Sequence, residues 1–126
     1  MPQKLRILLV EDEDHLLDAI KLNLELEGYK VHAVKDGKTA LKVFKEERFN
    51  LIILDVMLPD GNGLDICKDL KNDAFTKHIP VILMSANVQN EALSAASSPD
   101  DYISKPFDLD YIENRIKRLL GAKKVA

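Results

Sequence analysis

The stretch "LIILDVMLP", residues 51–59, carries a single charged side chain, Asp55, within an otherwise apolar run. A carboxylate that is buried without a partner is costly, so an acid in this run needs a physical reason. Continuous apolar runs of this kind are typical of parallel strands that helices cover on both faces. The stretch therefore predicts a central strand that ends near Asp55 and holds the carboxylate at its end.

Four other short runs predict strands in the same way. "RILLV" at residues 6–10 and "VILMS" at residues 81–85 are strongly apolar, whereas "YKVHAV" at residues 29–34 and "DYIS" at residues 101–104 are weaker. A weaker apolar character suits a strand that is covered less completely. We therefore expect the two weaker runs at the two edges of the sheet.

Between these runs, apolar residues recur at the spacing of an amphipathic helix. The predicted helices lie at residues 16–24, 38–48, 64–70, 90–96 and 109–120. Gly28 and Gly121 are the predicted stop signals of the first and last helices. Strand–helix pairs with short connections are the signature of an α/β doubly wound parallel sheet. We expect one domain over residues 1–126, with its core at about residues 5–120.

The composition excludes several classes of function. The chain has 18 Lys and Arg against 21 Asp and Glu, so its net charge of −3 gives no general attraction to nucleic acid or anionic lipid. Cys67 is the single cysteine, which excludes an internal disulfide. No segment approaches the roughly 20 apolar residues of a membrane span, and the start does not resemble a signal peptide. We expect a cytoplasmic protein that binds neither membranes nor nucleic acid directly.

Charged and polar residues stand where the predicted strands end. "EDED" at residues 11–14 follows the first strand, Asp55 ends the third, Ser85 ends the fourth, and Lys105 follows the fifth. Because ligands of an open parallel sheet bind beyond the carboxyl ends of its strands, these groups should share one edge. Clustered carboxylates stay ionised only beside positive charge, and ligation by oxygen alone favours Mg²⁺ over Zn²⁺. The three histidines are scattered along the chain, and we interpret them as ordinary surface or edge residues.

Four motifs carry a resemblance to a known family. "ILLVEDED", "LIILDVMLPDGNGLD", "VILMSA" and "DDYISKPF" occur in this order, and the resemblance that they carry spans about residues 5–120. Together they resemble the response-regulator receiver domains of two-component signal transduction. The resemblance implies a flavodoxin-like fold, with a five-stranded parallel sheet in the order 2-1-3-4-5 and five helices.

The resemblance also implies roles for the matching residues. Asp55 matches the aspartate that accepts a phosphoryl group and contributes to Mg²⁺ binding. Asp12 matches a direct Mg²⁺ ligand, Glu11 matches an acid that acts on the ion through water, and the main-chain oxygen of Met57 matches a further ligand. Gly63 matches a residue of the loop that follows the acceptor.

Three more residues match the part of the site that would respond to phosphorylation. Ser85 matches the hydroxyl that bonds the phosphoryl group after transfer, and Lys105 matches the lysine that pairs with it. Tyr102 matches a switch residue that turns inward on activation, although a half-buried aromatic on an edge strand is an open alternative. The Lys105–Pro106 peptide bond matches one that is typically cis in this family.

These roles imply a phosphorylation-dependent signalling switch and not an enzyme that acts on other substrates. A sensor histidine kinase or a histidine phosphotransfer protein would supply the phosphoryl group in a Mg²⁺-dependent reaction. The domain would catalyse only its own phosphorylation and dephosphorylation. A change in the face formed by the fourth helix, fifth strand and fifth helix would regulate an output domain or docking protein, and a phosphorylation-dependent homodimer is a further implied state.

The region between Ser85 and Lys105 departs from the family pattern. It is shorter than expected, and Ser98-Pro99 replaces the common Gly-Ala pair. Because proline fixes φ and cannot donate a backbone hydrogen bond, we predict a short or irregular fourth helix, so the family's standard dimer mode is not carried over to this chain. The chain ends soon after the last predicted helix, so we expect either a stand-alone receiver or a piece of a longer regulator.

Three other functions are open alternatives. A Mg²⁺-dependent aspartyl-phosphate phosphohydrolase commonly has a second acid two positions after the nucleophile, where this chain has Met57. A flavin-binding electron carrier would need a Ser, Thr and Gly-rich phosphate loop after the first strand, where this chain has "EDED". An unphosphorylated protein-interaction module would be indicated by loss of the acidic edge residues, all of which are present.

Overall fold

The structure is a computed structural model that describes residues 4–86 and 98–125. Its main sheet has five parallel strands in the order β2-β1-β3-β6-β7. The strands are β1 (Arg6–Val10), β2 (Lys30–Val34), β3 (Leu51–Asp55), β6 (Val81–Ser85) and β7 (Asp101–Ser104). Because β6 and β7 are the fourth and fifth strands of this sheet along the chain, the predicted order is confirmed, and the two weaker runs form its edges.

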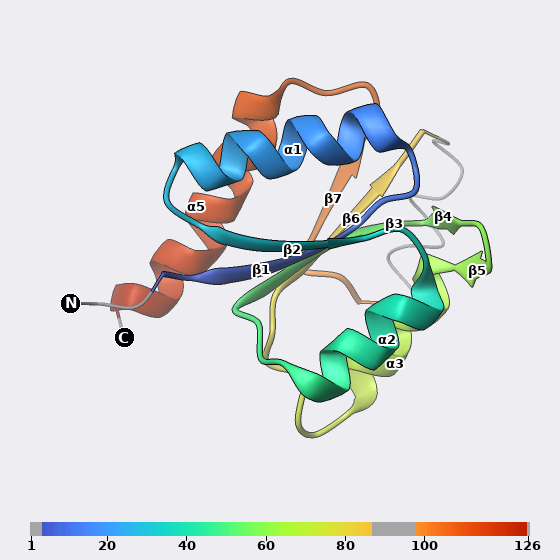
Figure 1. The fold of residues 1–126 in the computed structure, drawn as a ribbon. Helices are drawn as coiled ribbons and strands as arrows, with labels where there is room; N and C mark the ends of the chain where they lie inside the picture. The colour runs from blue at the N-terminus through green and yellow to red at the C-terminus, as the bar shows by residue number, and fades with distance from the viewer. Residues whose placement is uncertain (1–3, 87–97, 126) are drawn as a thin grey trace.

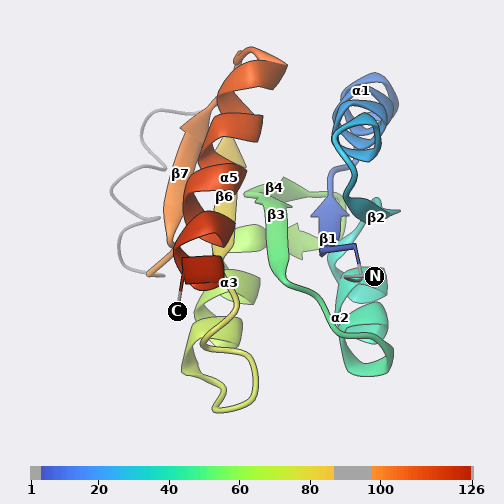
Figure 2. The same ribbon diagram turned by 90° about the vertical axis from the view of Figure 1, so that its left-hand side faces the viewer.

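Helices cover both faces of the main sheet (Figures 1 and 2). Helices α1 (Asp14–Leu26) and α5 (Leu109–Val125) lie on one side, and α2 (Gly37–Glu46) and α3 (Gly63–Asn72) lie on the other. Successive residues of a strand point to opposite faces, so the strands divide their side chains between two cores. Ile53 packs in the core under α1 and α5, whereas Leu54 packs in the core over α2 and α3. This arrangement explains why "LIIL" is apolar without alternation.

The first helix begins and ends as its sequence indicates. Glu13 is the N-cap, and its carboxylate accepts hydrogen bonds from the main-chain N–H of His15 at 3.0 Å and of Leu16 at 2.7 Å. These two bonds lower the pKa of the exposed Glu13 carboxyl group, with the bond from Leu16 the larger cause. Gly28 follows the helix with φ of 100°, a conformation that glycine adopts without strain. The predicted stop at Gly28 is therefore confirmed.

The prediction that Gly121 ends the last helix is wrong, because α5 continues to Val125. Glycine tolerates helical dihedrals, although it costs up to about 1 kcal/mol relative to alanine there. A Cβ at Gly121 would have no neighbour within 4 Å, so no close approach requires glycine at this position. The following "AKK" has high helix propensity, which favours continuation over a stop.

Four helices lie in the described part of the chain, against five predicted. The remaining predicted helix, at residues 90–96, lies outside the described residues, as does the expectation that it is short or irregular. No helix of the described chain is long and apolar enough to span a membrane.

The sequence did not predict a small hairpin after the central strand. Strands β4 (Met57–Leu58) and β5 (Gly61–Asn62) pair antiparallel, with Met57 opposite Asn62 and Leu58 opposite Gly61. Two-residue strands are too short to show a period in the sequence. The hairpin lies directly beyond the carboxyl end of β3, beside α2 and α3 (Figure 1).

Candidate functional site

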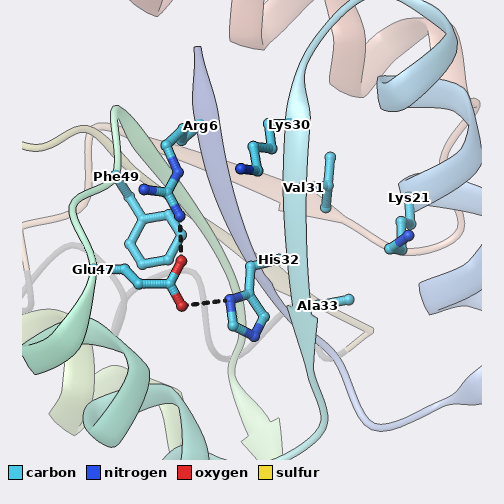
Figure 3. A pocket seen from close by; sticks show the side chains of 8 residues that line it. All are labelled: Arg6, Lys21, Lys30, Val31, His32, Ala33, Glu47 and Phe49. Atoms are coloured by element: carbon cyan, nitrogen blue, oxygen red, sulfur yellow. Dashed lines mark hydrogen bonds and ion pairs between the residues drawn. The ribbon is translucent and has the colours of Figure 1, made fainter. Parts of the chain in front are cut away.

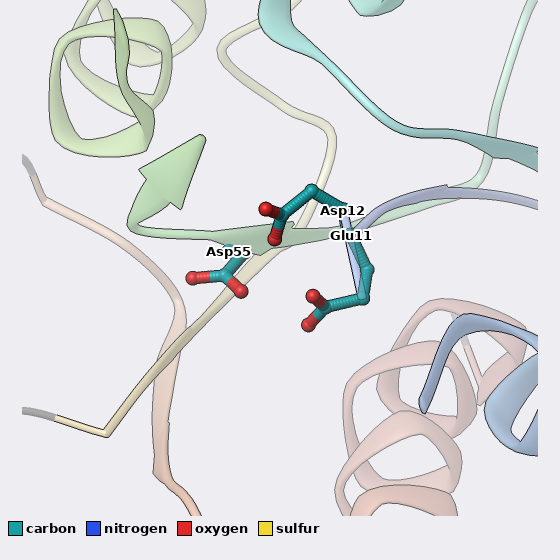
Figure 4. Close-up of side chains that lie close together, drawn as sticks. All are labelled: Glu11, Asp12 and Asp55. Atoms are coloured by element: carbon teal, nitrogen blue, oxygen red, sulfur yellow. The ribbon is translucent and has the colours of Figure 1, made fainter. Parts of the chain in front are cut away.

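Acidic side chains converge at the carboxyl edge of the main sheet (Figure 4). Glu11 and Asp12 directly follow β1, and Asp55 is the last residue of β3. These two strands are neighbours, and their register places Val10 opposite Leu54. Carboxylate oxygens from the three residues therefore lie within 4.8 Å of one another.

Lys105, which directly follows β7, brings a positive charge to the acidic group. Its Nζ atom lies 2.7 Å from Glu11 Oε1 and 2.6 Å from Asp55 Oδ2. Glu11 is fully buried and Asp55 is 4% exposed, whereas Asp12 is exposed. A buried carboxylate is costly unless it is paired and hydrogen-bonded, and the ammonium group meets that need for both buried acids.

Burial and the hydrogen bonds between the two side chains shift the pKa values of Glu11 and Lys105 in opposite directions. Burial raises the pKa of Glu11 to about 7, while the hydrogen bond from Lys105 acts in the lowering direction. Burial alone would lower the pKa of Lys105, but hydrogen bonds to Asp55 and Glu11 raise it. Lys105 therefore stays protonated, and Glu11 holds a proton that is readily lost near neutral pH.

Main-chain groups complete the surroundings of Asp55. The N–H of Met57 donates to Asp55 Oδ1 at 2.9 Å, so both carboxylate oxygens have partners. The N–H of Gly63 donates to the main-chain oxygen of Val56 at 2.7 Å. A Cβ at Gly63 would stand 2.1 Å from the main-chain oxygen of Asp55, so only glycine fits at this position. The loop after β3 is packed directly against the acidic residue.

A hollow of about 520 Å³ opens at this edge. It is lined by Glu11, Asp12, Glu13, Asp55, Met57, Ala86 and Lys105. Five of these seven residues are sequence-predicted site residues. Glu13 was predicted only as a member of the acidic run at residues 11–14, with no role of its own.

The remaining predicted residues lie at or near the same edge. Ser85 ends β6 directly before Ala86, and its side chain is buried. Tyr102 lies in β7, half-buried and packed against the core over α2 and α3. The Lys105–Pro106 peptide bond is cis. Cys67 is fully buried in α3 and packs in the same core as Tyr102.

The acidic group has the chemistry of a site for a hard cation. It offers three carboxylates and no nitrogen or sulfur ligand among the residues that the structure describes. Mg²⁺ prefers oxygen ligands, usually one or two carboxylates with several waters. The open hollow beside exposed Asp12 leaves space for such waters, so the residues fit this ion.

A second hollow, of about 290 Å³, lies beside edge strand β2 (Figure 3). There the Glu47 carboxylate pairs with the Arg6 guanidinium, and its other oxygen lies 3.0 Å from His32 Nδ1. The guanidinium also lies over the ring of Phe49, 5.4 Å from its centroid. Arg6 begins β1 and Asp55 ends β3, so this hollow lies at the other end of the sheet from the acidic residues. The network joins β1 and β2 to the segment between α2 and β3.

Residues 7–117 match the family model described as the response regulator receiver domain. The chain therefore belongs to the response regulator receiver domains, a signalling class of two-component systems. The resemblance carried by the four sequence motifs is confirmed.

Among the curated relatives of the chain are transcriptional regulatory proteins. It is similar to the transcriptional regulatory protein CrdR of Helicobacter pylori, with 44% identity over 118 residues that cover 92% of this chain and 55% of the relative. It is also similar to the alkaline phosphatase synthesis transcriptional regulatory protein PhoP of Bacillus subtilis, with 34% identity over 96% of this chain and 50% of the relative. The chain spans about half the length of these curated relatives.

Solved structures share the fold over nearly their whole length. A putative response regulator from Chloroflexus aurantiacus has a TM-score of 0.89 at 26% identity, with 94% of this chain and 99% of the other covered. The response regulator TrrA of Thermotoga maritima, solved in complex with Mg²⁺–BeF, has a TM-score of 0.82 at 31% identity, with coverage of 91% and 98%.

Proposed function

We propose that this domain accepts a phosphoryl group on Asp55 and acts as a phosphorylation-dependent signalling switch. The observation that carries the proposal is the position of the Asp55 carboxylate, which ends the central strand within 2.6 Å of Lys105 Nζ and beside two further acids. An aspartate carboxylate is a competent nucleophile toward phosphorus, and phosphoryl transfer depends mainly on positioning and charge neutralisation.

Mg²⁺ is the cofactor that we infer for this reaction. Asp12, Asp55 and the main-chain oxygen of Met57 would hold the ion directly, and Glu11 would act through water. When bound, the ion would supply positive charge to oxygens that carry more negative charge during transfer. The oxygen-only composition of the cluster supports this assignment.

The chain's own residues would position the transfer. A carboxylate oxygen of Asp55 forms the new bond to phosphorus, the bond from phosphorus to the donor atom breaks, and the donor keeps that electron pair. The N–H of Met57 holds the other end of the carboxylate in place at 2.9 Å. Lys105 can then pair with a phosphoryl oxygen, as charge-assisted bonds of this kind are strong.

Ser85 and Tyr102 would carry the change away from Asp55. Ser85 ends the strand next to β3 and would donate its hydroxyl to a phosphoryl oxygen. Tyr102 lies on edge strand β7, where an inward turn of its ring would alter the outer face of the sheet. The fourth-helix region, β7 and α5 would together form the output face, and a phosphorylation-dependent homodimer is a further part of this proposal.

The partners follow from the family and from the length of the relatives. A sensor histidine kinase or histidine phosphotransfer protein in the cytoplasm would donate the phosphoryl group. The relatives named above are transcriptional regulators about twice as long as this chain, so an output domain or a separate docking protein would receive the signal. We infer that residues 1–126 form one receiver domain, that it binds no nucleic acid itself, and that it catalyses only its own phosphorylation and dephosphorylation.

Intact mass measurement after incubation with Mg²⁺ and acetyl phosphate tests the proposal. The wild-type chain should gain one phosphoryl group, and Asp55→Asn should gain none. Asp69→Asn, a change at an exposed aspartate of α3, is the matched control and should gain the group like wild type. Chelation of Mg²⁺ should abolish the gain.

Two results would overturn this function. A wild-type chain with no added phosphoryl group would contradict it, as would a gain that survives Asp55→Asn. Turnover of an external phosphomonoester faster than Asp55 loses its own phosphoryl group would instead favour the phosphohydrolase, although exposed Met57 stands where that reaction needs an acid.

A further inference from the structure

The β4–β5 hairpin is held to the domain at two places by polar side chains. Asn62 is the N-cap of α3, and its Oδ1 atom accepts a hydrogen bond from Leu64 N at 2.8 Å. Asp60 lies in the turn between the two strands and reaches a different helix. Its Oδ1 accepts from Gly37 N at 2.8 Å, and its Oδ2 accepts from Lys38 N at 2.9 Å.

The partner of Asp60 is the N-terminus of α2, which begins at Gly37. The first N–H groups of a helix have no partner within the helix, and that end carries partial positive charge. Asp36 caps the same end from within the chain, because its Oδ1 accepts from Thr39 N at 2.7 Å. Asp60 therefore accepts hydrogen bonds from N–H groups that Asp36 does not reach. These bonds lower the pKa of the Asp60 carboxyl group, and the bond from Gly37 is the largest cause.

The hairpin is also seated closely on this helix end. A Cβ added to Gly37 would lie 2.8 Å from Ile66 Cδ1, 3.3 Å from Asp60 Oδ1 and 3.7 Å from Leu58 Cδ1. Leu58 is the one buried side chain of the hairpin, and Met57, Pro59, Asp60, Gly61 and Asn62 are exposed. Little apolar packing holds the hairpin, so its side-chain hydrogen bonds contribute to fixing its position, together with the main-chain bond from Gly63 N to Val56 O at its base.

A residue of the hairpin lines the hollow at the acidic site. Met57, the first residue of β4, donates its N–H to Asp55 Oδ1 at 2.9 Å and lines the hollow. We propose that Asp60 is a positioning residue, which ties the turn of the hairpin to α2 and thereby holds the Met57 main chain in place for Mg²⁺ binding and phosphoryl transfer to Asp55. This inference rests on the proposed function.

The test compares Asp60→Ala with Asp36→Ala, which removes a cap from the same helix but leaves the hairpin tie intact. The chain has no tryptophan, so Mg²⁺ affinity is measured by isothermal titration calorimetry. Asp60→Ala should weaken Mg²⁺ binding roughly tenfold, as loss of a residue that orients a metal ligand does. Asp36→Ala should bind Mg²⁺ like wild type, because the Asp36 side chain accepts its hydrogen bond from Thr39 N within α2.

Hydrogen exchange of the Met57 amide, measured without metal or phosphodonor, gives a second readout. Asp60→Ala should speed this exchange, since the N–H that donates to Asp55 is no longer held, and Asp36→Ala should leave it unchanged. Asp60→Asn keeps one carbonyl oxygen and should fall between wild type and Asp60→Ala. If Asp60→Ala does not fold, Asp60→Asn against Asp36→Asn makes the same comparison.

The outcomes separate this inference from the proposed function. A wild-type chain that neither binds Mg²⁺ nor gains a phosphoryl group defeats the proposed function. If the wild type does both and Asp60→Ala matches it in affinity and Met57 exchange, only the role of Asp60 is overturned. Equal losses in Asp60→Ala and Asp36→Ala also overturn it, because they would trace to α2 and not to the hairpin.

Discussion

Asp55 is the one acid in an apolar strand, and its two carboxylate oxygens both have partners. Lys105 Nζ lies 2.6 Å from Oδ2, and Met57 N lies 2.9 Å from Oδ1. Removing a charge from water costs several kcal/mol unless such partners replace the water. The ammonium group and the amide replace it here, which explains how the strand can end in an aspartate that is only 4% exposed.

The raised pKa of Glu11 should make Mg²⁺ binding depend on pH. Its pKa is raised to about 7 in the folded, metal-free protein, so below that pH the side chain carries a proton that an acid beside Mg²⁺ must lose. We expect Mg²⁺ affinity to rise as pH increases from 6 to 8, with close to one proton released per ion at pH 6. Calorimetry in buffers of different ionisation enthalpy measures that proton.

The same raised pKa has a defined effect on stability. Between pH 4.5 and about 7 the folded chain holds a proton on Glu11 that the unfolded chain has released, so the free energy of unfolding of the metal-free protein falls as pH rises through this window. Glu11→Gln should remove this slope and the proton release together. Proton release that persists in Glu11→Gln would assign it to another group.

Replacing Gly63 by alanine should disturb the loop after Asp55 by a steric clash. Gly63→Ala would place a methyl group 2.1 Å from the main-chain oxygen of Asp55, so backbone must move. We expect a loss of about 1–3 kcal/mol in urea unfolding, the usual cost of overpacking. Gly61→Ala, a change two residues earlier in β5 where a Cβ would have no neighbour within 4 Å, should stay within about 0.5 kcal/mol of wild type. Equal effects of the two changes would contradict the close approach at Gly63.

Among the elements, the strands of the main sheet were predictable and the ends of some helices were not. The apolar runs at β1, β6 and β7 coincide with the strands that form, because each run is buried along its length or bounded by charged residues. The hairpin of β4 and β5 was missed, since two residues per strand contain no pattern. The last helix was predicted to stop at Gly121 and does not, because glycine permits a stop without imposing one.

Gly121 within α5 and Gly28 after α1 should respond in opposite ways to replacement by alanine. Gly121→Ala should raise the free energy of unfolding by about 0.5–1 kcal/mol, because alanine is the better helix former and nothing lies within 4 Å. Gly28→Ala should lower it by about 1–2 kcal/mol, since φ of 100° is strained for any other residue. Thermal and urea unfolding measure both. A loss of stability in Gly121→Ala would mean that the helix ends there after all.

At the scale of the whole molecule, the site exists only when three separate strands are aligned. Glu11 and Asp12 follow β1, Asp55 ends β3, and Lys105 follows β7. Parallel pairing of β1 with β3, and of β3 with β7 through β6, brings these ends together. Any ligand of the site therefore binds the folded chain and not the unfolded one.

This coupling predicts that Mg²⁺ stabilises the fold. At a free concentration one hundred times the dissociation constant, a ligand of the folded state adds about 2.7 kcal/mol, which should raise the melting temperature by several degrees. Asp12→Asn should lose most of the increase, because it removes a carboxylate from the cluster. Asp18→Asn, at an exposed position of α1, should keep it. An increase that is equal in both variants would place the ion elsewhere.

The order of short apolar and amphipathic segments was enough to predict a doubly wound parallel sheet, and the polar residues at the strand ends were enough to predict which side chains meet at one edge of it. Both are local properties of the chain, because periodicity and strand termination depend on residues close in sequence. The sequence alone did not determine that Lys105 Nζ lies between Glu11 and Asp55, that Asp60 binds the N-terminus of α2, or that Gly63 touches the backbone of Asp55. Those contacts join residues far apart along the chain or fit one atom against another, and only the packing of helices on the sheet decides them.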